Sequence, residues 1–214
     1  MLQLTNFATV CENKSTVFFQ VTMTQLQTKR FTIEEYHRLT QLGFLTEGDR
    51  VELIRGELIQ MAAKGTPHSV CNTKLIRELE KLLCETAVVR CQEPVTLYPN
   101  SEPEPDAVIV RGQPDDYLVN HPQPEDIFLL IEVSDSTLKY DQTEKLSLYA
   151  ENQIQNYWIL NLVTYELERY SQPYRDTQGK YNYRNKQISL TTETVLLPGF
   201  ANLSLNLNSV FPSI

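Results

Sequence analysis

Apolar and polar residues alternate along the first part of the chain in a pattern that predicts a helix followed by a hairpin. In the stretch FTIEEYHRLTQLGFL, Thr32 precedes Glu35 by three residues, which is the spacing of a capping box. A short helix is therefore expected to begin here and to end near Gly43. The stretch RVELIRGELIQM has two apolar runs on either side of Arg55-Gly56, which is typical of a β-hairpin.

The middle of the chain predicts a longer helix and then three strands. Residues 66–84 carry apolar residues at helical spacing, which form one stripe: Val70, Leu75, Leu79, Leu82 and Leu83. Strands are expected in AVVRCQEPVTLY, PDAVIVRG and DIFLLIEV, with a proline-rich loop over residues 112–126 between the last two.

The second half predicts one more helix and several strands. Asp141 and Glu144 have capping-box spacing, so a helix is expected from Asp141 to about Asn152. YWILNL should be a strand, and residues 165–190 should form a β-hairpin appended to the end of the sheet. This mixed order predicts an α/β or α+β domain, in which helices pack against one mixed central sheet, with an N-terminal helix and hairpin and a C-terminal hairpin as additions.

Length and charge restrict the organisation and the class of protein. The 214 residues suit one domain, expected over residues 25–214. Residues 1–24 are expected to be a poorly structured extension, with Met23 as an alternative start; the competing interpretation is a short strand in VFFQVTM. The net charge of −8 argues against a protein that coats nucleic acid by general electrostatics, so such contact has to be local or assisted by a metal.

Other features indicate a cytoplasmic protein. No apolar run approaches the roughly 18 residues of a membrane span. The N-terminus has no charged region followed by a long apolar stretch, as a secretory signal would. The four cysteines form no C-x-x-C pair, so neither a zinc site nor a disulfide framework is indicated and reduced thiols are expected.

The most apolar stretch of the chain, FLLIEV, contains a carboxylate, Glu132. Because the run predicts a strand that is buried on both faces, an ionised Glu132 needs a cation or several hydrogen-bond donors. Asp106 begins the preceding strand, and if the two strands pair, the two carboxylates lie close together across one ladder. Two hard oxygen ligands suit Mg²⁺ or Mn²⁺, which would be the missing partner. The alternatives are a Glu132 satisfied by Arg or Ser donors and an Asp106 that serves a turn.

Lys145 is one turn into the helix that follows Glu132. Its long stem borders the expected apolar stripe, so its ammonium can reach the end of the strand and stabilise an attacking water or a pentavalent phosphate. The alternative is an ordinary surface lysine paired with Glu144 or Glu151.

Basic residues and tyrosines alternate near the C-terminus. They could form a ribbon that binds a nucleic-acid backbone, and the alternative is the exposed face of a hairpin. The residues are Arg169, Tyr170, Tyr174, Arg175, Lys180, Tyr181, Tyr183, Arg184 and Lys186.

Several motifs together resemble a known family. In chain order they are VELIRGE at residues 51–57, PD at 105–106, EVSDSTL at 132–138, YD at 140–141, KL at 145–146, LYA at 148–150 and YWI at 157–159. Over roughly residues 30–210 the chain resembles the Uma-type putative restriction-endonuclease family of the PD-(D/E)XK nuclease-like superfamily.

The resemblance implies a restriction-endonuclease-like core in which carboxylates hold a divalent cation and activate water for phosphodiester cleavage. Asp106 would be the Asp of the P-D motif and Glu132 the acidic residue of the E-x-K motif. The sequence departs from that pattern because Ser134 stands where the motif has Lys. Lys145 would then be a migrated lysine that reaches the same point from the helix.

Two more residues match positions of the family. Glu52 matches an upstream acidic position and would be a further ligand or a water-orienting group; the alternative is an outward residue of the hairpin. His68 matches a frequent family histidine that would orient water or phosphate; the alternative is a histidine that packs at the helix terminus.

The sequence thus predicts a Mg²⁺- or Mn²⁺-dependent endonuclease that acts on DNA, expected by resemblance to form a homodimer. Ser134 favours a different hypothesis, in which a nuclease-like fold has lost catalysis and binds nucleic acid or protein. A metal-dependent hydrolase of smaller phosphoesters is the third hypothesis.

Overall fold

The computed structural model describes residues 27–213. The expected extension over residues 1–24, the alternative start at Met23 and the strand considered in VFFQVTM lie outside the described residues. Within the described range no helix is long and apolar enough to cross a membrane.

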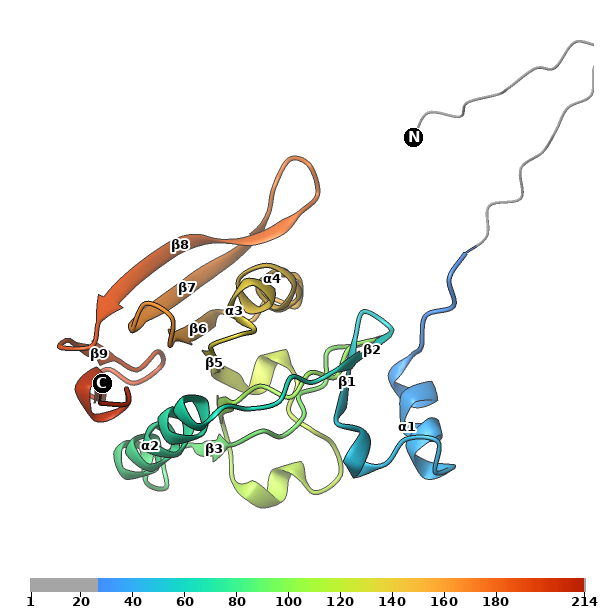
Figure 1. Ribbon diagram of the computed structural model, residues 1–214, viewed down its shortest axis with the longest axis horizontal. Helices are drawn as coiled ribbons and strands as arrows, with labels where there is room; N and C mark the ends of the chain where they lie inside the picture. The colour runs from blue at the N-terminus through green and yellow to red at the C-terminus, as the bar shows by residue number, and fades with distance from the viewer. Residues whose placement is uncertain (1–26, 214) are drawn as a thin grey trace, which may run out of the picture.

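A six-stranded mixed sheet forms the centre of the molecule (Figure 1). Its strands follow one another in space in chain order: β3 (Val88–Arg90), β4 (Ala107–Val110), β5 (Ile127–Ser134), β6 (Asn156–Asn161), β7 (Glu166–Arg175) and β8 (Tyr181–Leu190). Only β5 and β6 run parallel, and every other neighbouring pair is antiparallel. The predicted mixed sheet with helices against it is confirmed.

The parallel pair requires a crossover, which a broken helix provides. After β5 the chain forms three consecutive helical segments before it enters β6: α3 (Leu138–Tyr140), the π-helical turn η4 (Asp141–Lys145) and α4 (Leu146–Glu151). Parallel strands need such a connection because a tight turn cannot join them. The crossover begins at the carboxyl end of β5, and this end of the sheet is where a pocket forms.

The sheet is buried on both faces. Alternate residues of a strand point to opposite sides, and on β5 Leu129, Ile131 and Val133 join the core that contains α2 (Thr66–Leu83). Leu130 joins a second core under α4. Both cores are continuous clusters of buried residues, which explains why the sequence of β5 is almost entirely apolar apart from Glu132.

The N-terminal helix and hairpin form as predicted. In α1 (Ile33–Gln41), Thr32 and Glu35 make the reciprocal hydrogen bonds of a capping box. The strands β1 (Val51–Ile54) and β2 (Glu57–Gln60) pair antiparallel through Arg55 and Gly56, which have φ angles of 48° and 78°. A Cβ on Gly56 would lie 2.6 Å from the Cβ of Arg30, so this tight approach requires glycine.

Three sequence predictions are wrong in detail. Residues 87–98 are not one strand, because only β3 and an isolated bridge between Leu97 and Ser101 form there. The crossover helix begins at Leu138 and not at Asp141, whose side chain accepts hydrogen bonds from Ser134 and Thr137. Val70 does not belong to the buried stripe of α2, because 45% of it is exposed.

The predicted C-terminal hairpin is confirmed at the end of the sheet. β7 and β8 form it, and the first six residues of β7 pair with β6, so the hairpin extends the main sheet. A small separate hairpin follows, made of β9 (Thr194–Leu196) and β10 (Ser204–Asn206). Short 3₁₀ turns occupy connections elsewhere: η1 (Glu47–Asp49), η2 (Pro114–Tyr117), η3 (Pro124–Asp126) and η5 (Leu207–Ser209).

Candidate active site

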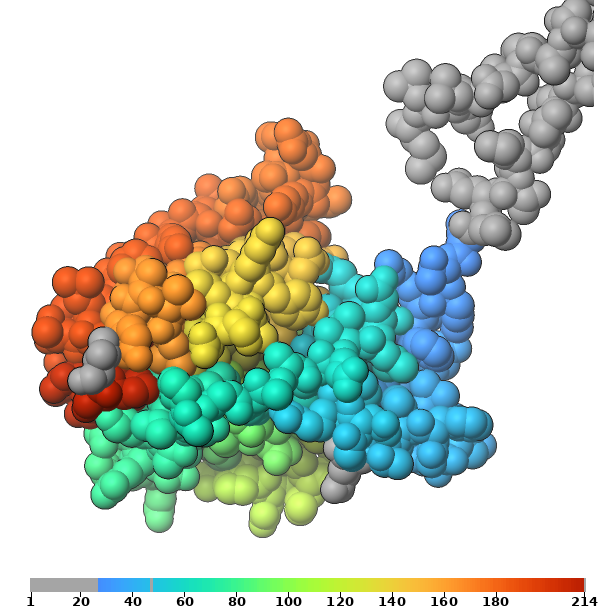
Figure 2. Space-filling model, viewed as in Figure 1, coloured from blue at the N-terminus to red at the C-terminus, as the bar shows by residue number. Residues whose placement is uncertain are grey.

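A pocket of about 270 Å³ lies at the carboxyl end of β5. One wall is the connection from β2 to α2, and the other is the chain from the end of β5 through η4. These two segments meet on one face of the molecule, where the teal and yellow regions adjoin (Figure 2). All five site residues predicted from the sequence line this pocket: Glu52, His68, Asp106, Glu132 and Lys145.

Asp106 and Glu132 lie beside each other because β4 and β5 pair. Ala107 is opposite Ile131 in the antiparallel ladder, which places Asp106 opposite Glu132. The backbone N–H of Asp106 points to Glu132 Oε2 at 3.4 Å, and the N–H of Val133 donates to Asp106 Oδ2 at 3.0 Å. The predicted strand pairing and the proximity of the two carboxylates are thus confirmed.

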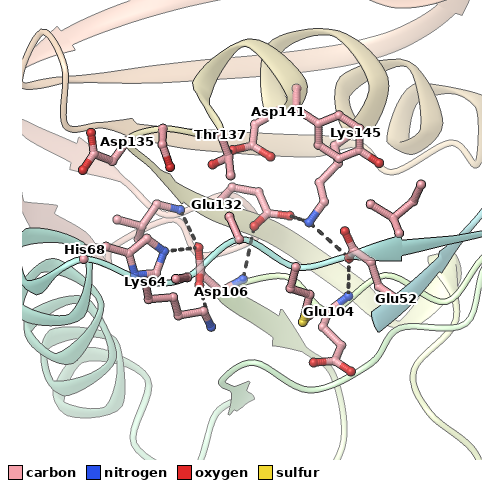
Figure 3. A pocket seen from close by; sticks show the side chains of 18 of the residues that line it. Glu52, Lys64, His68, Glu104, Asp106, Glu132, Asp135, Thr137, Asp141 and Lys145 are labelled. Atoms are coloured by element: carbon pink, nitrogen blue, oxygen red, sulfur yellow. Dashed lines mark hydrogen bonds and ion pairs between the residues drawn. The ribbon is translucent and has the colours of Figure 1, made fainter. Parts of the chain in front are cut away.

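His68 and a lysine hold the Asp106 carboxylate (Figure 3). His68 Nε2 lies 2.9 Å from Asp106 Oδ2, and Lys64 Nζ lies 3.6 Å from Oδ1. Burial raises the pKa of Asp106, but His68, the N–H of Val133 and the charge of Lys64 outweigh it, so the pKa lies below its usual value. Asp106 is therefore ionised at neutral pH.

Glu132 finds its partners within the chain. Lys145 Nζ lies 3.0 Å from Glu132 Oε1, and the hydroxyl of Tyr149 donates to the same oxygen at 2.8 Å. Burial is the main cause that raises the pKa of Glu132, which reaches about 8. The positive charge of Lys145 opposes this shift, and the negative charges of Asp141, Asp106 and Glu52 add to it. The side chains that donate to Glu132 are therefore Lys145 and Tyr149, and not an Arg or a Ser. Because these donors are present, the burial of Glu132 does not by itself require a metal as its partner.

Lys145 is buried and bridges two carboxylates. Its ammonium also lies 3.3 Å from Glu52 Oε2, and only 8% of its side chain is exposed. Burial lowers its pKa, but Glu132, Glu52 and Asp141 outweigh this and raise the pKa well above its usual value. The alternative of a surface lysine paired with neighbouring glutamates is wrong. Arg55 takes those partners instead, at 2.8 Å from Glu151 and 3.6 Å from Glu144.

Glu52 and His68 are both buried, which excludes an outward hairpin position for Glu52. Glu52 Oε2 accepts the backbone N–H of Glu104 at 3.1 Å in addition to its contact with Lys145. His68 lies in the first turn of α2 and contacts Asp106 directly, so it does more than pack at the helix end.

The sequence did not indicate Asp141 as a site residue. Its carboxylate accepts hydrogen bonds from Ser134 Oγ and Thr137 Oγ1, both at 2.7 Å. Burial raises the pKa of Asp141 despite the opposing charge of Lys145 and these two hydroxyls. Ser134, which replaces the lysine of the E-x-K motif, thus ties the end of β5 to the π-helical turn that carries Lys145. Such turns are frequent at functional sites.

Tyr149 and Lys64 were missed as well. Tyr149 follows Lys145 by four residues, and this spacing places both side chains on one helix face, which is the signal that could have found it. Lys64 lies in an irregular connection, whose path no local pattern predicts.

The residues fit a divalent cation in their donor chemistry. Asp106 Oδ1 and Glu132 Oε2 have only contacts of 3.4 Å or longer, so one oxygen of each carboxylate is left for a ligand. Within residues 27–213 no group of three or more His, Cys, Asp or Glu side chains is arranged to hold a metal. Water and substrate would have to complete the coordination, as is usual for Mg²⁺.

The alternation of basic residues and tyrosines near the C-terminus does not form one continuous surface ribbon. Tyr170 and Tyr183 are buried, with 6% of each exposed, and they pack against Tyr157 in the core. Lys186 pairs with the buried Glu168 at 2.8 Å. The exposed cation–aromatic pairs that are left are Arg175 over Tyr181 and Arg184 over Tyr174.

Comparisons with known proteins agree with the family that the motifs indicate and with the observed fold. A family model described as "Uma2: Putative restriction endonuclease" matches residues 33–208. The fold is similar to the crystal structure of a putative nuclease belonging to DUF820 from Anabaena variabilis ATCC 29413, with a TM-score of 0.64 and 15% sequence identity over 85% of this chain and 97% of that chain. No curated protein matches the chain.

Proposed function

The chain belongs to the Uma2 family of putative restriction endonucleases, as its motifs predicted, and from this premise we propose that it is a divalent-metal-dependent endonuclease of DNA. The proposed active site is the pocket around Asp106 and Glu132. The observation that carries the proposal is the pair of carboxylates that faces this pocket across the β4–β5 ladder. Hard oxygen ligands on adjacent strands, close to buried acid–base groups, are what metal-assisted phosphodiester hydrolysis requires.

The charge of the pocket supports cation binding. Six carboxyl side chains line it, against the two lysines Lys64 and Lys145: Glu52, Glu104, Asp106, Glu132, Asp135 and Asp141. A phosphodiester would meet repulsion from this excess of negative charge unless a cation is bound. A divalent cation held by Asp106 and Glu132 would lower the pKa of a bound water and offset charge on the phosphate.

The other residues position these two carboxylates. His68 and the N–H of Val133 fix Asp106 Oδ2, and Oδ1 is left with no contact shorter than 3.4 Å. Lys145 and Tyr149 fix Glu132 Oε1 in the same way and leave Oε2. Because the two carboxylates are already held in place, they lose little conformational entropy when a cation binds.

A catalytically silent binding module is the second candidate. It is favoured by Lys145, whose ammonium is engaged by both Glu132 and Glu52, and by Ser134, whose hydroxyl is engaged by Asp141. On this hypothesis the buried charges specify the fold, and binding of a partner would survive the loss of both candidate metal ligands.

The test is titration of Mn²⁺ by calorimetry, combined with cleavage of plasmid and single-stranded DNA in Mn²⁺. Asp106→Asn is the test variant, and Asp115→Asn, an exposed aspartate in η2, is the matched control. We expect wild type and Asp115→Asn to bind the metal and cut DNA, whereas Asp106→Asn does neither. Metal binding by wild type without any cleavage of polynucleotide would favour a smaller phosphoester as substrate. Absence of metal binding at millimolar Mn²⁺ would favour the binding module.

We also propose that the protein acts as a cytoplasmic homodimer, because two copies would address both strands of a duplex. Light scattering coupled to size-exclusion chromatography measures the mass directly. A mass near that of one 24.7 kDa chain across the working concentration range would contradict this proposal.

A further inference from the structure

The two lysines that face the pocket differ in how far their charge is already compensated. Lys145 is within 3.3 Å of both Glu132 and Glu52 and is almost inaccessible. To bind a substrate, its ammonium would have to leave these two buried carboxylates without a cation, which is costly. Lys145 is therefore fitted to hold the carboxylates and not to contact a phosphate.

Lys64 has the opposite character. It lies in the connection between β2 and α2, and 27% of its side chain is exposed, compared with 8% for Lys145. Its nearest carboxylate oxygen is Asp106 Oδ1 at 3.6 Å, which is too long for a hydrogen bond. Within the described range Lys64 has no other ion pair. Its ammonium donors are thus available to a group that enters the pocket (Figure 3).

We propose that Lys64 binds a non-bridging oxygen of the substrate phosphate and is the phosphate-contacting lysine of this protein. The inference rests on the proposed function. Asp106 Oδ1 is the oxygen that the chain leaves for a cation, and Lys64 approaches this same oxygen, so a phosphate next to the cation would also lie next to the ammonium. Gly65 is the N-cap of α2, and the partial positive charge at this helix end acts in the same direction.

The first experiment measures cleavage of supercoiled plasmid in Mn²⁺ by the full chain. The variants are Lys64→Met and Lys64→Arg, and the control is Lys139→Met, an exposed lysine that does not line the pocket. We expect Lys64→Met to lose about 100-fold in rate, as on removal of a group that stabilises developing charge. Lys64→Arg should retain most of the rate, and Lys139→Met should match wild type. Mn²⁺ affinity of Lys64→Met should be unchanged or tighter, because a positive charge beside Asp106 is gone.

The second experiment separates phosphate contact from cleavage. Fluorescence anisotropy of a labelled DNA duplex is measured in Ca²⁺, which takes oxygen ligands as Mg²⁺ does. Loss of one phosphate contact should weaken binding by about tenfold and lower the slope of log affinity against log salt by about one unit.

The outcomes are distinct. If wild type binds DNA without cutting it, and Lys64→Met weakens binding, the endonuclease proposal fails while the role of Lys64 stands. If Lys64→Met binds and cuts as wild type does, the role of Lys64 is wrong and the endonuclease proposal stands. If wild type neither binds nor cuts DNA, both are wrong.

Discussion

Lys145 shows how a single buried charge can organise a site. Its ammonium is shared by Glu132 and Glu52, which come from separate sheets of the fold. Removing one partner of such a buried cluster leaves uncompensated charge, which costs about 3–5 kcal/mol. We therefore expect Lys145→Met to lower the free energy of unfolding in urea by that amount, whereas the partly exposed Lys64→Met should change it by less than about 1 kcal/mol. Equal losses in both variants would contradict the division of roles between the two lysines.

The sequence predicted this cluster only in part, and the reason is physical. Asp106 and Glu132 could be placed together because strands close in sequence tend to pair, and that rule is local. Lys145 could be placed near Glu132 because the helix that carries it follows directly. The approach of Glu52 and His68 depends on tertiary packing of the hairpin and α2, and only the family resemblance indicated them.

At the scale of elements, several contacts hold the π-helical turn η4 to the sheet, among them the ion pair of Lys145 with Glu132 of β5 and the hydrogen bond from the Tyr157 hydroxyl to the Asp141 carbonyl. Ser134 and Thr137 bind Asp141 on one side, and Gln142 donates to Glu168 of β7 at 2.6 Å on the other. The capping-box spacing of Asp141 and Glu144 suggested a helix start, but the side chain of Asp141 is used for tertiary contacts, so the helix begins earlier. Local capping signals cannot reveal this, because the competing donors come from β5 and its following loop.

Glu168 gives a testable pH dependence. Burial raises its pKa, but hydrogen bonds from Lys186, Tyr170 and Asn161 outweigh burial, so the pKa lies below the ordinary value of 4.5. A lowered pKa means that Glu168 stabilises the fold above pH 4.5 and loses this contribution as the pH falls through the folded value. Glu168→Gln should cost about 1–2 kcal/mol at pH 7, and the difference from wild type should shrink as the pH falls below 4.5 and through the lowered pKa of the folded state.

Urea unfolding at several pH values between 3 and 7 measures this difference directly. The half-buried Glu166, two residues earlier on the same strand, provides the control, and Glu166→Gln should differ from wild type by less than about 0.5 kcal/mol at every pH. A loss in Glu168→Gln that is the same at pH 3 and pH 7 would show that its carboxylate charge does not contribute.

At the scale of the whole molecule, the net charge of −8 and the acidic pocket both oppose the DNA binding that we propose. Attraction to the phosphate backbone comes mainly from clustered lysine and arginine. The basic and aromatic residues of β7 and β8 do not supply such a cluster, because two of the tyrosines are buried and Lys186 is neutralised by Glu168. On the proposed function, a divalent cation bound at the pocket would supply local positive charge next to Lys64.

DNA association should therefore depend on the divalent cation itself and not only on ionic strength. We expect labelled duplex to bind in Ca²⁺ and to show no binding in EDTA at the same ionic strength, because without the cation the net negative charge of the acidic pocket repels the phosphates. Asp106→Asn should bind equally weakly in both buffers, whereas Asp115→Asn should behave as wild type. Equal binding in Ca²⁺ and EDTA would place the DNA on another face, and the exposed pairs of Arg175 with Tyr181 and Arg184 with Tyr174 would then be the next surface to substitute.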